Sequence, residues 1–174
     1  MTNTNNLQLL KWDLSHVKAL LRSKNDLAAL LQVSVPVGWP QFPEAFSLPA
    51  DKTVETSKPP DWGGYFFIDL QNKALVGSGG FYGQPDAVGN VEIGYEIASE
   101  YWNRGFATQA VQKMVDYAFA HEQVRTITAH TLAEINASNS VLKKIGMKFV
   151  AEIDDAENGK LWRWQMSRDN YHSI

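Results

Sequence analysis

The stretch from Val91 to Thr108 combines residue types that could bind an anion and move a proton. Val91 to Ile97 alternates apolar and other residues, which predicts a strand, and a helical apolar stripe begins at Ala107. The first turn of a helix leaves N–H groups unpaired and is partly positive, so small residues there allow a phosphate group to approach. Gly105 and Ala107 are small, and Arg104 adds a full positive charge. These residues alone are also compatible with an ordinary helix start.

Two ordered motifs extend this pattern. Trp102-Asn103-Arg104-Gly105-Phe106-Ala107 resembles the acetyl-CoA pyrophosphate loop, Q/R-x-x-G-x-G/A, of the GNAT superfamily of N-acetyltransferases. The stretch Thr131–Met147 resembles the second cofactor motif, N-A-S-x-x-V-L-x-K-x-G-F in the branch similar to ribosomal-protein-alanine N-acetyltransferases. The resemblance covers roughly residues 62–166. Trp102 replaces the usual Gln or Arg, and Leu142 stands where many members carry a tyrosine acid, so that tyrosine is not available here.

The resemblance implies that acetyl-CoA is the co-substrate and that an amine receives the acetyl group. Pantetheine is expected to pair with the backbone of the strand end, in the manner of an added strand. The implied pyrophosphate ligands are Arg104, Gly105, Phe106, Ala107 and Thr108, and the implied pantetheine ligands are Ile97, Ala98, Asn136 and, as a weaker candidate, Asn139.

Acetylation of an amine at neutral pH needs a base, because an ammonium group has no lone pair. The resemblance implies Glu92 as this catalytic base; Glu96 lies on the same strand face and is the less favoured choice. Both could instead be solvated strand carboxylates. Ser138 falls where this branch places a residue near the CoA sulfur. Its hydroxyl could assist the leaving thiolate, or it could simply cap the following helix, and the two roles are equally supported.

The surrounding elements predict an α+β fold with a mixed, mostly antiparallel central sheet flanked by helices, and the resemblance makes this a GNAT-like acyl-CoA N-acyltransferase fold. Two short helices are expected within 16–33, broken near Asn25 and Asp26, and Gly77–Gly80 is expected to form a strand close to a ligand or a bulge. The remaining expected elements are a hairpin of 65–68 with 74–77, strands at 91–97 and 126–129, a helix from about 105, a helix ending at Gly146, and a hairpin of 149–153 with 161–166. Residues 36–60 hold six of the seven prolines and are expected to be irregular, either as a binding wall or as a connector.

Composition narrows the remaining possibilities. The 174 residues suit a single domain, 1–174, and the absence of cysteine excludes disulfides and thiolate metal sites. The four histidines show no ligand spacing, so no metal is expected. The net charge of −3 and the lack of a long apolar run argue against nucleic acid and membrane partners. We expect a cytoplasmic protein, monomeric or homodimeric.

Two functions of different class stay open at this stage. The chain could be an N-acetyltransferase acting on a small molecule or a protein N-terminus by direct transfer. It could instead be a GNAT-like module that binds acyl-CoA and acts through regulation or protein contact without turnover. A donor other than acetyl-CoA is also open, because the pocket volume is not visible in the sequence. Large aromatic residues could line an amine pocket or belong to the core: Trp39, Phe42, Phe46, Trp62 and Tyr65.

Overall fold

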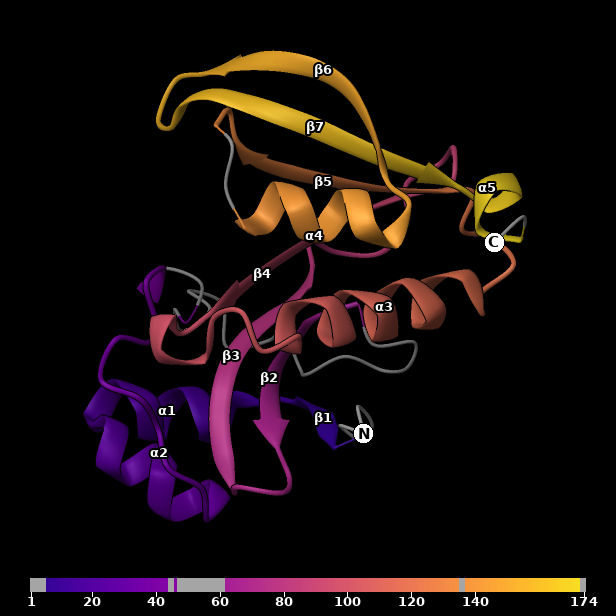
Figure 1. Ribbon diagram of the computed structural model, residues 1–174. Helices are drawn as coiled ribbons and strands as arrows, with labels where there is room; N and C mark the ends of the chain where they lie inside the picture. Colours follow the sequence, from indigo (N-terminus) through magenta and orange to yellow (C-terminus); the bar gives the residue numbers. More distant parts are fainter. Residues whose placement is uncertain (1–5, 44–45, 47–61, 135–136, 173–174) are drawn as a thin grey trace. The chain divides into compact units, whose positions relative to one another are not determined.

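The computed structural model describes residues 6–43, 46, 62–134 and 137–172, whose helices and strands are labelled in Figure 1. They belong to two compact units. Unit 1 comprises residues 1–80 and 95–106, and unit 2 comprises residues 81–94 and 107–174. The chain therefore passes from one unit to the other within two strands and at the start of one helix.

Unit 1 contains an antiparallel arrangement of β1 (Leu7–Lys11), β2 (Gly64–Asp69) and β3 (Ala74–Phe81), in the order β1-β2-β3. The hairpin of β2 and β3 confirms the sequence prediction. Strand β1 was not predicted, because the two adjacent leucines at its centre break the alternation that marks a half-buried strand. The segment is a strand because it pairs with β2, with Leu9 opposite Phe67, and this pairing is not visible in its own sequence pattern.

Two short helices, α1 (Leu14–Arg22) and α2 (Lys24–Leu31), follow β1, as predicted. They are separated at Ser23, not at Asn25 and Asp26. Ser23 has an extended backbone, with φ −170° and ψ 158°, and its hydroxyl accepts the N–H of Asp26. The break therefore occurs where a side chain caps the second helix, which is the usual place of serine at a helix start.

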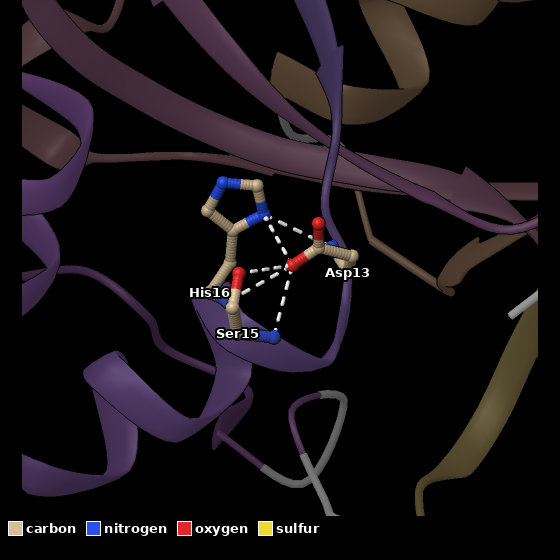
Figure 2. A network of polar contacts seen from close by, with 3 residues as sticks. All are labelled: Asp13, Ser15 and His16. Carbon is tan, nitrogen blue, oxygen red and sulfur yellow. Dashed lines mark hydrogen bonds and ion pairs between the residues drawn. The ribbon is translucent and has the colours of Figure 1, made fainter.

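Asp13 caps α1 through a network that Figure 2 shows from close by. Its Oδ1 accepts the backbone N–H of Ser15 at 2.9 Å and of His16 at 3.2 Å, and the Ser15 hydroxyl at 2.5 Å. His16 completes a capping box, because its Nδ1 accepts the backbone N–H of Asp13 at 3.0 Å. The donors that the helix start leaves open are thus satisfied locally.

The core of unit 1 is aromatic. Trp39, Phe46 and Phe66 are buried, with ring centroids 5.3–6.0 Å apart, and they pack with Leu27 and Leu75. The indole N–H of Trp39 donates to the Ser78 hydroxyl at 2.9 Å, so its burial leaves no polar atom unpaired. Of the proline-rich stretch, Trp39 and Phe46 thus belong to the core, whereas Val37 and Phe42 are exposed. Residues 47–61 lie outside the described residues.

Glycines explain how β3 approaches its neighbour in unit 1. A Cβ on Gly77 would lie 2.2 Å from the carbonyl oxygen of Glu96, closer than any side chain can tolerate. Gly80 is equally restricted by the backbone of Gly63. The stretch Gly77–Gly80 lies in a strand, as predicted, and the register of β2 with β3 shifts beside Gly77. The close contacts of Gly77 and Gly80 are to protein backbone.

Unit 2 contains the order β4-β5-β7-β6, formed by β4 (Asn90–Ile97, of which Asn90–Gly94 belong here), β5 (Thr126–Leu132), β7 (Gly159–Ser167) and β6 (Lys148–Asp155). β4 and β5 are parallel, whereas β5–β7 and β6–β7 are antiparallel. The helices are α3 (Phe106–Phe119), α4 (Ala137–Ile145) and the short α5 (Arg168–His172), which was not predicted. The predicted α+β class with a mixed, mostly antiparallel sheet is confirmed.

The apolar stripe of α3 and one face of the neighbouring strands form the core of unit 2. Val91 and Ile93 of β4, Ile127 and Ala129 of β5 are buried, and so are the α3 residues Ala110, Val111, Met114, Val115 and Ala118. The alternate strand positions, which include Glu92, consequently face the opposite side of the sheet.

We predict that Asp13→Ala lowers the free energy of unfolding at pH 7 by about 1 kcal/mol, because the first turn of α1 loses its cap. The hydrogen bond from the Ser15 hydroxyl is the main cause that lowers the pKa of Asp13 below 3.8. A carboxylate with a lowered folded pKa stabilises the fold above its unfolded pKa, and this contribution is lost as the pH falls. Urea unfolding at pH 7 and pH 3 should therefore show a smaller difference from wild type at pH 3.

Asp13→Asn is the matched control for this prediction. It retains an acceptor oxygen and should keep most of the cap at pH 7, but it should lose the dependence on acid. An Asp13→Ala deficit of equal size at both pH values would contradict the assigned role of the charge.

Candidate functional site

The start of α3 has the geometry of an anion site. The helix begins at Phe106, directly after Gly105, whose φ is +83°. Asn103 also has a positive φ, of 60°, so two of the three residues before the helix adopt a left-handed backbone conformation. Gly105 adopts this conformation without steric cost. The first-turn residues Phe106, Ala107 and Thr108 are half-buried, and the N–H groups of a first helical turn have no partner within the helix.

Arg104 supplies the positive charge predicted for this link. Its guanidinium lies 5.4 Å from the Tyr101 ring centre and 5.3 Å from that of Phe106, close enough for cation–π attraction to both. Arg104 is exposed, so its charge stays accessible to solvent and ligands. The two rings thereby hold a flexible side chain beside the helix start.

The end of β4 in unit 1 has several of its backbone groups already paired. The Ala98 N–H donates to the Val76 carbonyl at 2.8 Å, and the Ala98 carbonyl accepts the Tyr101 N–H at 2.9 Å. The Ile97 carbonyl accepts the indole N–H of Trp102 at 2.7 Å. Since successive N–H groups of a strand point to opposite edges, the Ile97 N–H points away from β3. Ile97 is thus the better placed backbone donor of the two predicted residues.

Trp102 has a role that the sequence did not show. It occupies the first position of the phosphate-loop motif, and its indole N–H ties the link back to the strand end at Ile97. The side chain is still 51% exposed, so its ring forms part of the surface beside the link. The tryptophan therefore replaces the polar group of the motif with an intrachain hydrogen bond.

Glu92 lies in a chain of hydrogen bonds in unit 2. Its Oε1 is in short contact with Nδ1 of His130, and Nε2 of His130 is 3.3 Å from Nε of Arg163. The side chains of Glu92 and His130 are 35% and 23% exposed, so both are partly buried but accessible to solvent. Neither His130 nor Arg163 was predicted from sequence. In the β4–β5 pair Glu92 is opposite Thr128, so alternation puts His130 on the same face of the sheet as Glu92. The register of this pair cannot be read from the local sequence of either strand.

A depression of about 440 Å³ surrounds this chain of hydrogen bonds. Its lining is polar apart from Val88 and includes Asn90, Glu92, Thr126, Thr128, His130 and Arg163. The Asn90 Oδ1 accepts the hydroxyls of Thr126 at 3.0 Å and Thr128 at 2.6 Å, which joins the first residues of β4 and β5. The depression can therefore accept a small polar group next to a carboxylate.

Glu96, the less favoured base, has a structural role in unit 1. Its Oε1 accepts the N–H of Gln41 at 2.7 Å, and its Oε2 accepts the N–H of Phe42 at 3.1 Å. A carboxylate that receives two backbone N–H groups satisfies donors of an irregular segment.

Asn139 was predicted as a weaker pantetheine ligand, but the structure uses its side chain internally. It is buried, and its Oδ1 accepts the Thr131 hydroxyl and the indole N–H of Trp164. Its Nδ2 donates to the carbonyls of Leu132 and Glu134. An asparagine amide has two donors and a carbonyl with two lone pairs, so its hydrogen-bonding capacity is used within unit 2. Asn139 is therefore a buried clamp between α4, β5 and β7, and we do not retain it as a cofactor ligand.

The other predicted residues of the second motif are near Asn139 in sequence. Ser138 lies in the first turn of α4, one residue inside the helix, and is half-buried. Asn136 lies outside the described residues.

In the described ranges, no group of three or more His, Cys, Asp or Glu side chains could hold a metal ion. The same part of the chain has no helix that is both long and apolar enough to cross a membrane.

Comparison with known proteins gives one family. A family model described as "Acetyltransferase (GNAT) domain" matches residues 6–148. The uncharacterized N-acetyltransferase YjdG of Bacillus subtilis (strain 168) is 28% identical over 161 residues, which cover 90% of this chain and 94% of YjdG. The uncharacterized N-acetyltransferase p20 of Bacillus licheniformis is 31% identical over 96 residues, which cover 55% of this chain and 54% of p20.

Solved structures show the same fold. A ribosomal-protein-S5-alanine acetyltransferase from Vibrio fischeri is similar with a TM-score of 0.56 at 18% identity, covering 62% of this chain and 62% of that chain. RimJ from Mycobacterium smegmatis, solved in complex with CoA-disulfide, has a TM-score of 0.53 at 21% identity, covering 63% and 57%. The chain thus spans about three fifths of these two solved chains.

The role of Asn139 gives a stability prediction. Asn139→Ala removes the donor to two backbone carbonyls, the acceptor of the Thr131 hydroxyl and one of the two acceptors of the Trp164 indole. It should lower the free energy of unfolding by about 2–3 kcal/mol. Lys144→Ala, an exposed change on the same helix, is the control and should have little effect. Chemical denaturation of both variants measures the difference. Equal stability of the two variants would show that the Asn139 network does not support the fold.

Proposed function

Because the chain belongs to the GNAT family of acetyltransferases, we propose that it transfers the acetyl group of acetyl-CoA directly to an amine of a small molecule or a protein N-terminus. The observation that carries this proposal is the start of α3, where Gly105, Ala107 and Arg104 form a site suited to a diphosphate. Structural neighbours of the same fold are named for both kinds of acceptor, a ribosomal-protein alanine and spermidine or spermine.

The chain's own donors fit a diphosphate in charge and in size. The N–H groups of Phe106, Ala107 and Thr108 occupy the partly positive end of a helix of 14 residues. Arg104, held by two aromatic rings, neutralises further negative charge. When bound, acetyl-CoA supplies an acetyl group already activated as a thioester.

The strand end and α4 contribute the remaining contacts of the proposal. The Ile97 N–H and the second lone pair of its carbonyl are suited to hold the pantetheine amides, whereas the Ala98 N–H is used by Val76. The Ser138 hydroxyl, in the first turn of α4, is proposed to hydrogen-bond the departing sulfur. Asn136 stays a proposed pantetheine ligand.

Glu92 is the proposed catalytic base. Its Oε1 is engaged by His130, and no hydrogen bond to its Oε2 is present among the described residues. Oε2 can therefore take the proton that the acceptor ammonium must lose before attack. The acceptor is expected to enter the polar depression, which Glu92 lines.

We predict that acetyl-CoA stabilises the wild-type protein and that Ala107→Glu abolishes this effect. At a hundredfold excess over its dissociation constant, a ligand adds about 2.7 kcal/mol, a melting shift of about 5–10 °C for a chain of this size. The glutamate would place bulk and negative charge at the phosphate position, while a carboxylate in a first helical turn does not itself weaken the helix. Thermal-shift assays with acetyl-CoA, CoA and NAD measure binding.

Ala107→Ser is the matched control, since a small hydroxyl still admits phosphate and the shift should persist. If wild type showed no shift with acetyl-CoA or CoA, the co-substrate assignment would be wrong. A normal shift in Ala107→Glu would place the phosphate site elsewhere.

We predict that Glu92→Gln lowers kcat by about 10²–10⁴-fold, because glutamine keeps the shape but cannot take the proton. The thermal shift with acetyl-CoA should not change. The deficit should shrink as the pH rises toward the pKa of the acceptor amine, since a neutral amine needs no base. Release of free CoA with a panel of small amines and N-terminal peptides, measured from pH 6 to 9 around neutrality, tests this.

Two results would count against the proposal. Unchanged turnover of Glu92→Gln across this range would remove Glu92 from the chemical step. Binding of acetyl-CoA by wild type without CoA release on any amine would favour the alternative, a GNAT-like binding module without turnover.

A further inference from the structure

The strand register of unit 2 brings three charged or titratable side chains from separate strands onto one face. In the β4–β5 pair Glu92 is opposite Thr128, and His130 follows two residues later on the same side of β5. In the β5–β7 pair His130 is directly opposite Arg163. The imidazole thus lies between a carboxylate and a guanidinium, with one ring nitrogen in contact with each.

These contacts assign the proton on the imidazole. The Nε nitrogen of arginine is always a donor, so Nε2 of His130 must accept with its lone pair. The single proton of a neutral ring then resides on Nδ1, where it donates to Oε1 of Glu92. Of the two neutral tautomers, the arrangement therefore favours the one with its proton on Nδ1.

We propose that His130, held in its Nδ1–H tautomer by Arg163, is a positioning residue that fixes the carboxylate of Glu92 and leaves the second oxygen for the acceptor amine. This inference rests on the proposed function, in which Glu92 takes the proton. It adds that the orientation of the base depends on the hydrogen bond from β5. A base that rotates freely loses much of the advantage of correct orientation.

The same geometry argues against a proton relay through the ring. A relay would need a lone pair on Nδ1 to receive the proton from Glu92, and Nδ1 already carries a proton. Charged groups near the imidazole include Glu92 on β4, Arg163 on β7, Asp86 in the loop before β4 and Asp155 at the end of β6. The proton is therefore expected to stay on Glu92 Oε2 until it exchanges with solvent.

The tautomer can be measured without any activity. Nitrogen-15 NMR of histidine-labelled protein distinguishes a protonated ring nitrogen from one with a lone pair, and the signals that disappear in His130→Asn identify this ring among the four histidines. At pH 8 we expect wild-type His130 to carry its proton on Nδ1. A predominant Nε2–H form would overturn the proposal, whether or not the protein acetylates an amine.

Two substitutions separate positioning from mere packing. Asparagine places its amide N–H near the position of histidine Nδ1, so His130→Asn should keep turnover within about threefold, whereas His130→Leu, which lacks a donor, should lower kcat by about 10–100-fold. KM for acetyl-CoA should not change in either variant. His121→Leu, a histidine change in the turn that follows α3, is the control and should retain wild-type turnover.

The outcomes separate this inference from the proposed function. Wild-type turnover in His130→Leu, or an equal loss in His130→Asn and His130→Leu with both proteins folded, would overturn the positioning role even if Glu92→Gln is inactive. If Glu92→Gln retains full turnover, the base assignment itself is wrong, and the positioning role falls with it. Rescue by asparagine together with the Nδ1–H tautomer supports the proposal.

Discussion

The parallel pairing of β4 with β5 is the constraint on which the rest of the candidate site depends. Parallel neighbours cannot be joined by a tight turn and need a long crossover, usually a helix. Residues 98–125 form this crossover, and α3 is its helix. The start of α3 therefore has to follow the carboxyl end of β4. One topological requirement thus puts a partly positive helix end in the chain directly after the strand that carries Glu92.

The register of the strands then selects the partners of that carboxylate. The same pairing that buries Val91 and Ile93 turns Glu92 to the other face, where β5 presents His130. Because β7 pairs with β5 on its other side, Arg163 reaches the far nitrogen of the imidazole. A shift of any one of these strands by one residue would reverse the face of its side chains and separate the three groups.

Two polar residues near the motifs, Glu96 and Asn139, serve the fold. Glu96 binds two backbone N–H groups of the segment that follows Trp39, and Asn139 joins α4 to two strands. Both sets of hydrogen bonds form because backbone groups in buried or irregular segments need hydrogen-bond partners. The presence of Asn139 within the second motif is therefore explained by a structural role, and only its surroundings distinguish this role from that of a ligand.

The order of the elements, the α+β class and the link from β4 into α3 could be predicted from the sequence, because alternation, helical periodicity and motif spacing involve residues close together in the chain. Strand β1 escaped prediction, since its order comes from pairing with β2 and not from its own pattern. The partners of the polar side chains were decided by tertiary structure alone. His130 is 38 residues from Glu92 and 33 from Arg163, and Glu96 is 55 from Gln41. Contacts over such separations depend on register and crossover geometry, which no local pattern specifies.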